Sequence, residues 1–559
     1  MIVGFALAVI VSTVIAAFEF RFLMPYWDMT SFWQVYFAAK DQGLLWQLLL
    51  SGVNTPDQRV FLLPWFTVFD RWLVRGNGVS MIAGNFLFVA AAMACVLWSR
   101  TRDTTLSSAH KLAVAALMTV PAFSAIHITL ARPLFVVQYG QIACSVLAFA
   151  AAASLDGRIE HEDERSFLLP LSLIVAGNLF ATLMWGSGLV GWGVTLAFAL
   201  LRRWPARLIG SLFAAAAATL AAFYFASSAV PRTFSVRLTD LEPLVFIVHV
   251  VDYLANPAAI MLSGFFGPDT SHVVAQVVTV SGLVLMAAWM AAWVRSSRRP
   301  RSHFELLGLQ ILLFCLGVAM LTALARSHLG SDQAFSPRYS FRATWAWVVL
   351  IGIWVGDAPR KRLVPRLAIV AVVTIALLGP AQIRGIATYR GASEYLRPGY
   401  LALLAGVDDK AVTERIFPAS TGLFRVAARL REERLAIFSS PPAGWLGRPL
   451  DDSFRTDPSP IAGTWEASEV PTDPYGIVVE GVCQPDDTRI EWFLIVDANG
   501  IVRGIGRPLR YRDTDSPSFR WRGYAAMRPA QNEYRVYVLD ERSGAVRPLR
   551  QDAAAPGSD

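Results

Sequence analysis

The sequence predicts a polytopic α-helical membrane protein with about eleven transmembrane helices and a small C-terminal β domain on the outer face. Of the 559 residues, 55% are hydrophobic and only 16% are charged, and the mean hydropathy is +0.45. A soluble protein of this length would need more charge to cover its surface. Beyond residue 386 the long apolar stretches stop, and short runs typical of β-strands appear further on.

Apolar stretches long enough to cross a bilayer, which takes about 20 residues, recur through the first 386 residues. They cover residues 2–22, 77–98, 111–130, 135–155, 166–183, 185–201, 207–226, 275–295, 303–325, 341–356 and 365–385. The pair at 166–201 can also be one long helix that is broken in its middle. The first stretch is expected to be a retained helix, because Glu19, Phe20 and Arg21 stand where a small-residue cleavage site would be needed.

The short basic loops predict the orientation in the membrane, because Lys and Arg are enriched on the cytoplasmic side. Basic clusters stand at 100–102, 202–207, 295–301 and 360–362, and the expected spans place all four on one side. The N-terminus is then cytoplasmic, whereas the loop 25–75 and the chain after residue 386 lie outside. The apolar segment Phe246–Phe266 would break this pattern if it crossed, so we expect a re-entrant or interfacial helix there.

The domain organisation follows from these shifts in composition. Residues 1–386 form the transmembrane module, which includes the interfacial loop 25–75. After it we expect an outer-face helical segment at 387–440, a Pro/Gly-rich linker at 441–462, a β-sandwich or barrel at 463–550 and a disordered tail at 551–559. Ser420–Glu433 is amphipathic, and Asp497-Ala498-Asn499-Gly500 predicts a hairpin turn.

The composition also argues against several function classes. The net charge of +8 is explained by basic membrane loops, so no nucleic-acid partner is expected. The four cysteines have no metal or disulfide spacing, and His127, His249 and His272 have no ligand spacing, so they are expected to be structural. No phosphate-binding loop or dinucleotide fingerprint is present. No metal site or cofactor is predicted. Whether a divalent metal ion assists the reaction stays open, although the single carboxylate of Asp28 argues against a tight metal site.

The loop 25–75 combines aromatic residues with isolated charges, which suits helices that lie in the membrane interface. Asp28 follows Pro25-Tyr26-Trp27 directly after the first apolar stretch. A carboxylate flanked by aromatic rings at the membrane surface would be partly desolvated, which suits a general base. The alternative is a helix cap, because Asp-Met-Thr-Ser precedes an apolar run.

Two further sets of polar residues are candidates for contacts with a substrate. Asp57 and Arg59 follow a turn and open the next interfacial segment, where snorkelling charges are the alternative. Gln138 and Gln141 enter the fourth apolar stretch from the outer side. Their amides can bind sugar hydroxyls or hydrogen-bond neighbouring helices.

The loop 326–342 is the most polar outer segment between two spans. Its polar residues include His328, Asp332, Arg338, Tyr339 and Arg342. Arg338 beside Tyr339 is suited to holding a lipid-linked phosphate, because a guanidinium group binds phosphate oxygens bidentately. Anchoring at the membrane interface is the alternative for the same pair.

Together these features resemble the GT-C superfamily of integral-membrane glycosyltransferases, which use polyprenyl-phosphate-linked sugars. The resemblance covers most of residues 1–440. It rests on PYWD at 25–28, NTPDQR at 54–59, the broken apolar pair at 181–204 and SPRY at 336–339. PYWD is similar to the aromatic-Asp motif that holds the family's acidic residue, NTPDQR to an Asn-Glu-His-Arg-like element, and SPRY to a Ser-Arg-Tyr motif.

The resemblance implies transfer of a sugar from a polyprenyl-phosphate-linked donor to an envelope glycan or lipid acceptor, on the outer face of the bacterial cytoplasmic membrane. Asp28 would deprotonate the acceptor hydroxyl, and Arg338, with Arg59 and Tyr339, would stabilise the lipid-phosphate leaving group. Contacts to substrate are expected from the remaining candidates, Asp57, Gln138, Gln141 and His328. The donor, the acceptor and membrane lipids would be the partners.

The sequence departs from the family pattern at two places. Asp28 lacks the second acidic residue often found nearby, and Asp57-Gln58-Arg59 replaces the Glu-His-Arg-like element. Two alternatives to an enzyme therefore stay open. One is a transporter or flippase for a lipid-linked saccharide, and the other is a structural partner in envelope polysaccharide assembly.

Overall fold

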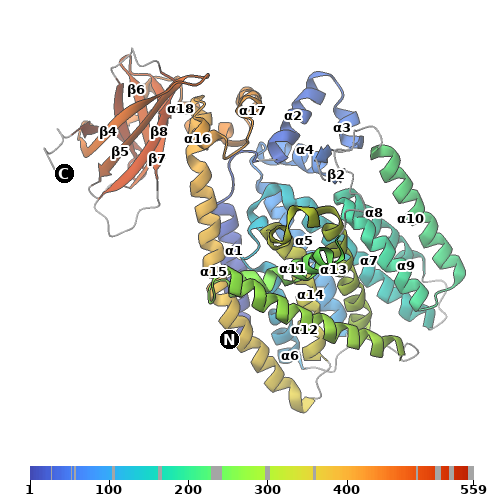
Figure 1. Ribbon diagram of the computed structural model, residues 1–559. Coiled ribbons are helices and arrows are strands. Elements are labelled where there is room, and N and C mark those ends of the chain that lie inside the picture. Colours follow the sequence, from blue (N-terminus) through green and yellow to red (C-terminus); the bar gives the residue numbers. More distant parts are fainter. Residues whose placement is uncertain are drawn as a thin grey trace. The chain divides into compact units, whose positions relative to one another are not determined.

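In the computed structural model (Figure 1), the chain forms two compact units. The structure describes residues 1–26, 28–51, 53–55, 58–102, 107–160, 167–227, 242–295, 302–356, 360–485, 489–509, 518–527 and 534–551. Unit 1 comprises Met1–Arg21, Gln47–Phe66 and Ser80–Tyr389, and unit 2 comprises Phe22–Trp46, Thr67–Val79 and Arg390–Asp559. Of the tail predicted at 551–559, only Gln551 is among the described residues.

Unit 1 is built from helices. They are α1 (Ile2–Glu19), α5 (Val79–Arg102), α6 (Ser108–Phe123), α7 (Val136–Glu160), α8 (Leu168–Met184), α9 (Leu189–Leu201), α10 (Ala206–Ser227), α11 (Pro243–Leu262), α12 (Pro268–Arg295), α13 (His303–Arg326) and α14 (Pro337–Gly356). The short strands β1 (Val53–Thr55) and β2 (Gln58–Val60) pair antiparallel. Three helices, α3 (Leu45–Ser51), α4 (Leu63–Val74) and α15 (Arg360–Ala405), contain residues of both units.

Within the described part of the chain, seven helices are long and apolar enough to cross a membrane. The predicted membrane-embedded helical class is therefore confirmed in its coarse form. The expected stretches overlap helices, although the one at 111–130 runs past the end of α6 at Phe123. The count of about eleven is not confirmed. One reason is that α6, α8 and α9 have 16, 17 and 13 residues, fewer than the roughly 20 that span a bilayer.

The segment Phe246–Phe266, expected to be re-entrant or interfacial, forms most of the continuous 20-residue helix α11. Its length and hydropathy meet the requirement for a membrane span, and Pro257 lies inside it without ending it. The sequence predicts no span here, because a crossing would place the basic cluster at 295–301 on the outer side. The polar residues of this helix are buried. The side of the membrane on which each loop lies stays a prediction.

The two apolar stretches predicted at 166–183 and 185–201 are present as the separate helices α8 and α9. Trp185 is extended between them, and the 3₁₀ turn η4 (Gly186–Gly188) follows. A side chain at Gly188 would come within 2.3 Å of the Ala181 backbone, so only glycine fits this tight return. Asn178 donates to Thr195 Oγ1 across the two helices (3.2 Å).

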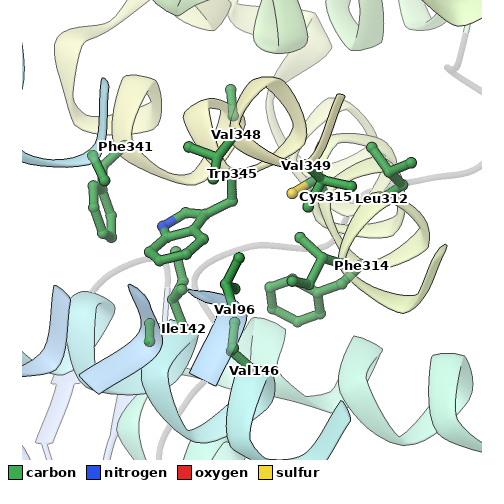
Figure 2. Close-up of a cluster of buried hydrophobic side chains, with 14 of the residues drawn as sticks. Val96, Ile142, Val146, Leu312, Phe314, Cys315, Phe341, Trp345, Val348 and Val349 are labelled. Atoms are coloured by element: carbon green, nitrogen blue, oxygen red, sulfur yellow. The ribbon is translucent and has the colours of Figure 1, made fainter. Parts of the chain in front are cut away.

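The core of unit 1 lies where α5, α7, α13 and α14 meet (Figure 2). Trp345 of α14 is 1% exposed and packs in one buried cluster with Ile142, Val146 and Phe314. These helices are apolar on most sides, as expected for helices surrounded by other helices or by lipid. Side chains of α7 and α14 thus belong to the same buried cluster, and both helices carry predicted site residues.

Unit 2 ends in a β-barrel. Its strands are β3 (Arg455–Thr456), β4 (Ile461–Val470), β5 (Gly476–Gln484), β6 (Ile490–Asp497), β7 (Val502–Pro508), β8 (Phe519–Ala525), β9 (Tyr534–Asp540) and β10 (Ala545–Gln551). The order β10-β4-β5-β8-β7-β6-β9 closes because β9 also pairs with β10, and β3 lies on β10. Closure leaves fewer open strand edges. Phe493 and Trp521 stack inside at 4.2 Å between ring centroids.

The predicted hairpin and the predicted linker had different outcomes. The turn after Asp497 is confirmed, with Gly500 at φ +76° and its N–H donating to the Asp497 carbonyl. The linker at 441–462 instead contains α18 (Pro441–Trp445), α19 (Leu450–Ser453), β3 and the start of β4. Its Pro and Gly residues form turns that bind to the barrel, because Gly447 N–H donates to Val502 O and Leu450 N–H to Gly500 O.

The helical part of unit 2 joins the interfacial loop to the C-terminal segment. Its helices are α2 (Asp28–Asp41), the end of α4, the end of α15, α16 (Lys410–Thr413) and α17 (Ser420–Glu432), followed by the 3₁₀ turn η8 (Ala436–Ser439). Glu433 pairs with Lys40 at 2.6 Å and with Arg71 at 2.7 Å. The predicted boundary at residue 386 lies inside the long helix α15, close to Tyr389, where unit 1 ends (Figure 1).

Glu433 should stabilise unit 2, and its contribution should depend on pH. Burial raises the pKa of Glu433, but the Lys40 hydrogen bond and the charges of Arg71, Lys40 and Arg429 outweigh it and lower the pKa overall. Because the folded-state pKa is depressed, the stabilisation is present above the unfolded-state pKa and is lost as the pH falls through the folded-state pKa.

We expect Glu433→Gln to lower the free energy of unfolding by about 1 kcal/mol at neutral pH, because it leaves two partly exposed cations facing a neutral amide. Chemical unfolding of the full chain in detergent, followed by tryptophan fluorescence, measures this loss. The matched control is Glu432→Gln, whose carboxylate is exposed and pairs within its own helix with Arg429. The control should change stability by less than about 0.5 kcal/mol. Equal effects of the two variants at neutral pH, or a Glu433 effect that persists in acid, would contradict this account.

Candidate functional site

The predicted site residues are divided between the two units. Asp28 is the first residue of α2, in unit 2, and its side chain is exposed. A carboxylate in the first turn of a helix is stabilised by the helix dipole, which is compatible with either interpretation of Asp28. Gln138, Gln141 and Arg338 belong to unit 1.

The NTPDQR segment at 54–59 is described only in part. Arg59 lies in β2, where its backbone is opposite Asn54. Asp57 lies outside the described residues. The next residue after this ladder, Phe61, donates its N–H to Leu183 O, so the strand pair is attached to the end of α8.

Gln141 is at the centre of a buried polar contact between three elements. Its side chain is fully buried in α7. The Nε2 atom donates to Ser187 Oγ in η4, and the Oε1 atom accepts from Arg342 Nη2 in α14, both at 2.8 Å. Gln141 thus makes the interhelical hydrogen bonds that the sequence left as one of two interpretations. Gln138 lies one turn earlier and is also buried.

Arg342 is the residue that the sequence argument named but did not select. Its side chain is 4% exposed, and its guanidinium lies over the Trp185 ring, 5.4 Å from Cζ to the centroid. Gln141 is neutral, and no ion pair joins Arg342 to an acid among the described residues. Its Nε atom also has no hydrogen-bond partner there. A buried arginine is almost always paired with an anion, so this cation is unusual.

Arg338 and Tyr339 lie in the first turn of α14, one turn before Arg342. The Arg338 guanidinium lies over the Tyr339 ring at 5.0 Å, and Tyr339 packs against Tyr253 of α11 at 5.1 Å. Two guanidinium groups four residues apart lie on the same face of a helix. That spacing is readable from the sequence and would have pointed to Arg342.

A polar stripe on α11 faces this region. His249, Asp252 and Asn256 are spaced by three and four residues, which places them on one face of the helix, and all three are buried. Asp252 Oδ1 accepts from Gln276 of α12, whereas Asp252 Oδ2 and both His249 ring nitrogens have no partner among the described residues. Buried polar atoms without partners in apolar helices are typical of functional sites.

Asn256 attaches the loop that carries SPRY to this stripe. Its Nδ2 atom donates to Ala334 O and to Ser336 O, both at 2.9 Å. Ser336 directly precedes α14, so the amide fixes the chain two residues before Arg338. The 3₁₀ turns η6 (Ser327–Leu329) and η7 (Ser331–Phe335) form the rest of the loop.

Replacing Asn256 by Ala should loosen the loop before α14. Two carbonyls would lose their donor, and an unsatisfied buried acceptor costs about 1–3 kcal/mol. We expect a lower melting temperature and faster proteolysis between residues 327 and 337. Ser263→Ala is the control, because Ser263 directly follows the same helix and its hydroxyl donates to Ile260 O, three residues away in the chain. Unchanged cleavage in Asn256→Ala would contradict the anchoring role.

The other histidines are placed as follows. His127 is buried and lies 3.0 Å from Ser340 Oγ and 2.9 Å from Pro121 O, which confirms its structural role. His272 stacks on Phe335 with centroids 3.9 Å apart. His328 lies exposed in η6. Among the described residues, no group of three or more His, Cys, Asp and Glu side chains could hold a metal ion.

The apolar helices and the closed β-sheet define a mostly helical, membrane-embedded protein with a C-terminal β-barrel. The chain matches no family model, no curated protein and no solved structure in comparisons with known proteins.

Proposed function

We propose that the protein is a membrane glycosyltransferase of the GT-C type. It transfers a sugar from a polyprenyl-phosphate-linked donor to an envelope glycan or lipid acceptor, on the outer face of the bacterial cytoplasmic membrane. The observation that carries this proposal is the buried guanidinium of Arg342, which has an amide and an indole ring as neighbours but no described carboxylate. A phosphate group would supply the missing negative charge.

The proposed reaction is a direct displacement at the anomeric carbon. Asp28 takes the proton of the acceptor hydroxyl, and the acceptor oxygen forms a bond to the anomeric carbon. The bond between that carbon and the phosphate oxygen breaks, and the lipid phosphate leaves with the electron pair. Arg342 and Arg338 stabilise the charge on the leaving phosphate, and Gln138 and Gln141 support the sugar or the arginine. The proton on Asp28 passes to water.

Glycan and lipid analysis of a deletion strain tests this proposal and separates it from the alternatives. We expect loss of one saccharide from an envelope glycan and accumulation of the lipid-linked sugar on the outer leaflet. A flippase would instead leave the lipid-linked sugar on the cytoplasmic leaflet. Unchanged glycans together with an unchanged lipid-linked pool would contradict both an enzyme and a flippase.

A further inference from the structure

Unit 2 contains a cavity that the proposed reaction does not use. Its volume is about 560 Å³, within the range of small-molecule sites, roughly 300–1,000 Å³. Five arginines from four segments line it: Arg75 after α4, Arg431 and Arg434 at the end of α17, Arg448 after α18 and Arg503 of β7. All five belong to unit 2, and no aspartate or glutamate lines the cavity.

Most of this positive charge is not neutralised within the described structure. Arg503 pairs with Asp497 at 2.8 Å, and Arg431 donates to the carbonyls of Leu403 and Leu404. Arg75, Arg434 and Arg448 form no side-chain ion pair with the described acids. A concave surface lined by one sign of charge concentrates its field and attracts oppositely charged ligands.

The backbone around the cavity holds two of these arginines in uncommon conformations. Arg75 has φ +57° and Arg434 has φ +52°, and Ala436, at φ +51°, donates its N–H to Arg75 O at 2.8 Å. Residues other than glycine rarely adopt positive φ, and where they do they often cluster at functional sites. The segment after α4 and the segment after α17 are thus joined by a hydrogen bond where both contribute a guanidinium.

We propose that this cavity binds a phosphate-bearing polyanion of sugar size. Guanidinium groups bind phosphate oxygens bidentately, and three unpaired arginines match a ligand with several negative charges better than a single carboxylate. The cavity shares none of its lining residues with the proposed transfer reaction, so it can be tested with binding alone.

The test is calorimetric titration of the full-length protein in a neutral detergent with inorganic pyrophosphate. We expect saturable binding that weakens as salt is added, because salt screens exposed charges. We test a single variant, Arg448→Gln, and a double variant that adds Arg434→Asn. Each should weaken binding at least about tenfold, a loss of 1.4 kcal/mol. Asparagine is chosen at Arg434 because it tolerates positive φ.

The matched control is Arg542→Gln, which removes an exposed arginine from the β9–β10 turn of the same unit. Near-UV circular dichroism reports whether each variant is folded, and the single Arg448→Gln variant serves if the double variant is not. Saturable binding that the control retains and the cavity variants lose supports the proposal. Absence of pyrophosphate binding at millimolar concentration, or equal loss in the control, overturns it.

Three further ligands identify the source of the phosphate. Glucose 1-phosphate that competes with pyrophosphate supports a soluble or glycan-borne sugar phosphate. Phosphatidylglycerol vesicles that compete, when glucose 1-phosphate does not, support a lipid headgroup as the occupant. Citrate that binds as tightly as pyrophosphate overturns the preference for phosphate, because citrate has only carboxylates.

Discussion

Replacing Asp28 by Asn should lower the rate of sugar transfer by about 10²–10⁴-fold, the usual contribution of a general base. The amide keeps the size of the side chain but cannot take the acceptor proton. Because Asp28 is exposed at the start of α2, the change should leave the melting temperature close to that of the unchanged protein. Release of polyprenyl phosphate from a labelled donor in membranes measures the rate.

Asp252→Asn is the informative comparison for this prediction. Asp252 is the buried carboxylate of the α11 stripe, and one of its oxygens has no described partner. Full activity in a correctly inserted Asp28→Asn protein would remove Asp28 from the mechanism. If Asp252→Asn were then the inactive variant, the base would belong to the α11 stripe in unit 1.

Replacing Arg342 by Gln should lower the rate by about 10²–10³-fold, the effect of removing one donor that stabilises a developing negative charge. Glutamine can still donate to Gln141 Oε1, so the contact between α7 and α14 has a replacement. We therefore expect a larger loss of rate than of stability. Initial rates and thermal melting of the same preparation measure the two effects.

Arg338→Gln serves as the comparison, because Arg338 is only half-buried and contacts the Tyr339 ring. We expect a smaller loss of rate than for Arg342→Gln. Equal rates for unchanged protein and a folded Arg342→Gln variant would contradict the role of Arg342 as the phosphate partner. A larger loss of rate in Arg338→Gln than in Arg342→Gln would favour Arg338 as the main phosphate-binding residue, as the sequence predicts.

The local features of the fold could be predicted from the sequence because neighbouring residues determine them. The hairpin at Asp497–Gly500 follows from turn chemistry, and the break between α8 and α9 coincides with a glycine-rich stretch. The helix α17 (Ser420–Glu432) follows from its amphipathic pattern. In each case the structure is predicted by turn residues or by an amphipathic pattern within a few positions of the chain.

Features that depend on distant contacts could not be predicted in the same way. Glu433 pairs with Lys40 and Arg71 across more than 360 positions, so the joining of the interfacial loop to the C-terminal segment has no local signal. Arg71 belongs to this ion-pair group and Arg75 lines the basic cavity, and the sequence near these two residues gives no sign of either contact. The segment that forms α11 was expected to be re-entrant or interfacial from the charges of the loops alone, and its burial among neighbouring helices has no local signal.

The central claim is that the protein consumes a lipid-linked sugar. Its most direct test is incubation of the purified protein, in lipid nanodiscs, with polyprenyl-phosphate-linked sugars and a membrane-glycan acceptor fraction from the source cells. Mass spectrometry then follows the lipid. We expect free polyprenyl phosphate to appear with the unchanged protein and at least about 10²-fold more slowly with Asp28→Asn. A donor pool that remains intact with the folded, unchanged protein would contradict the claim.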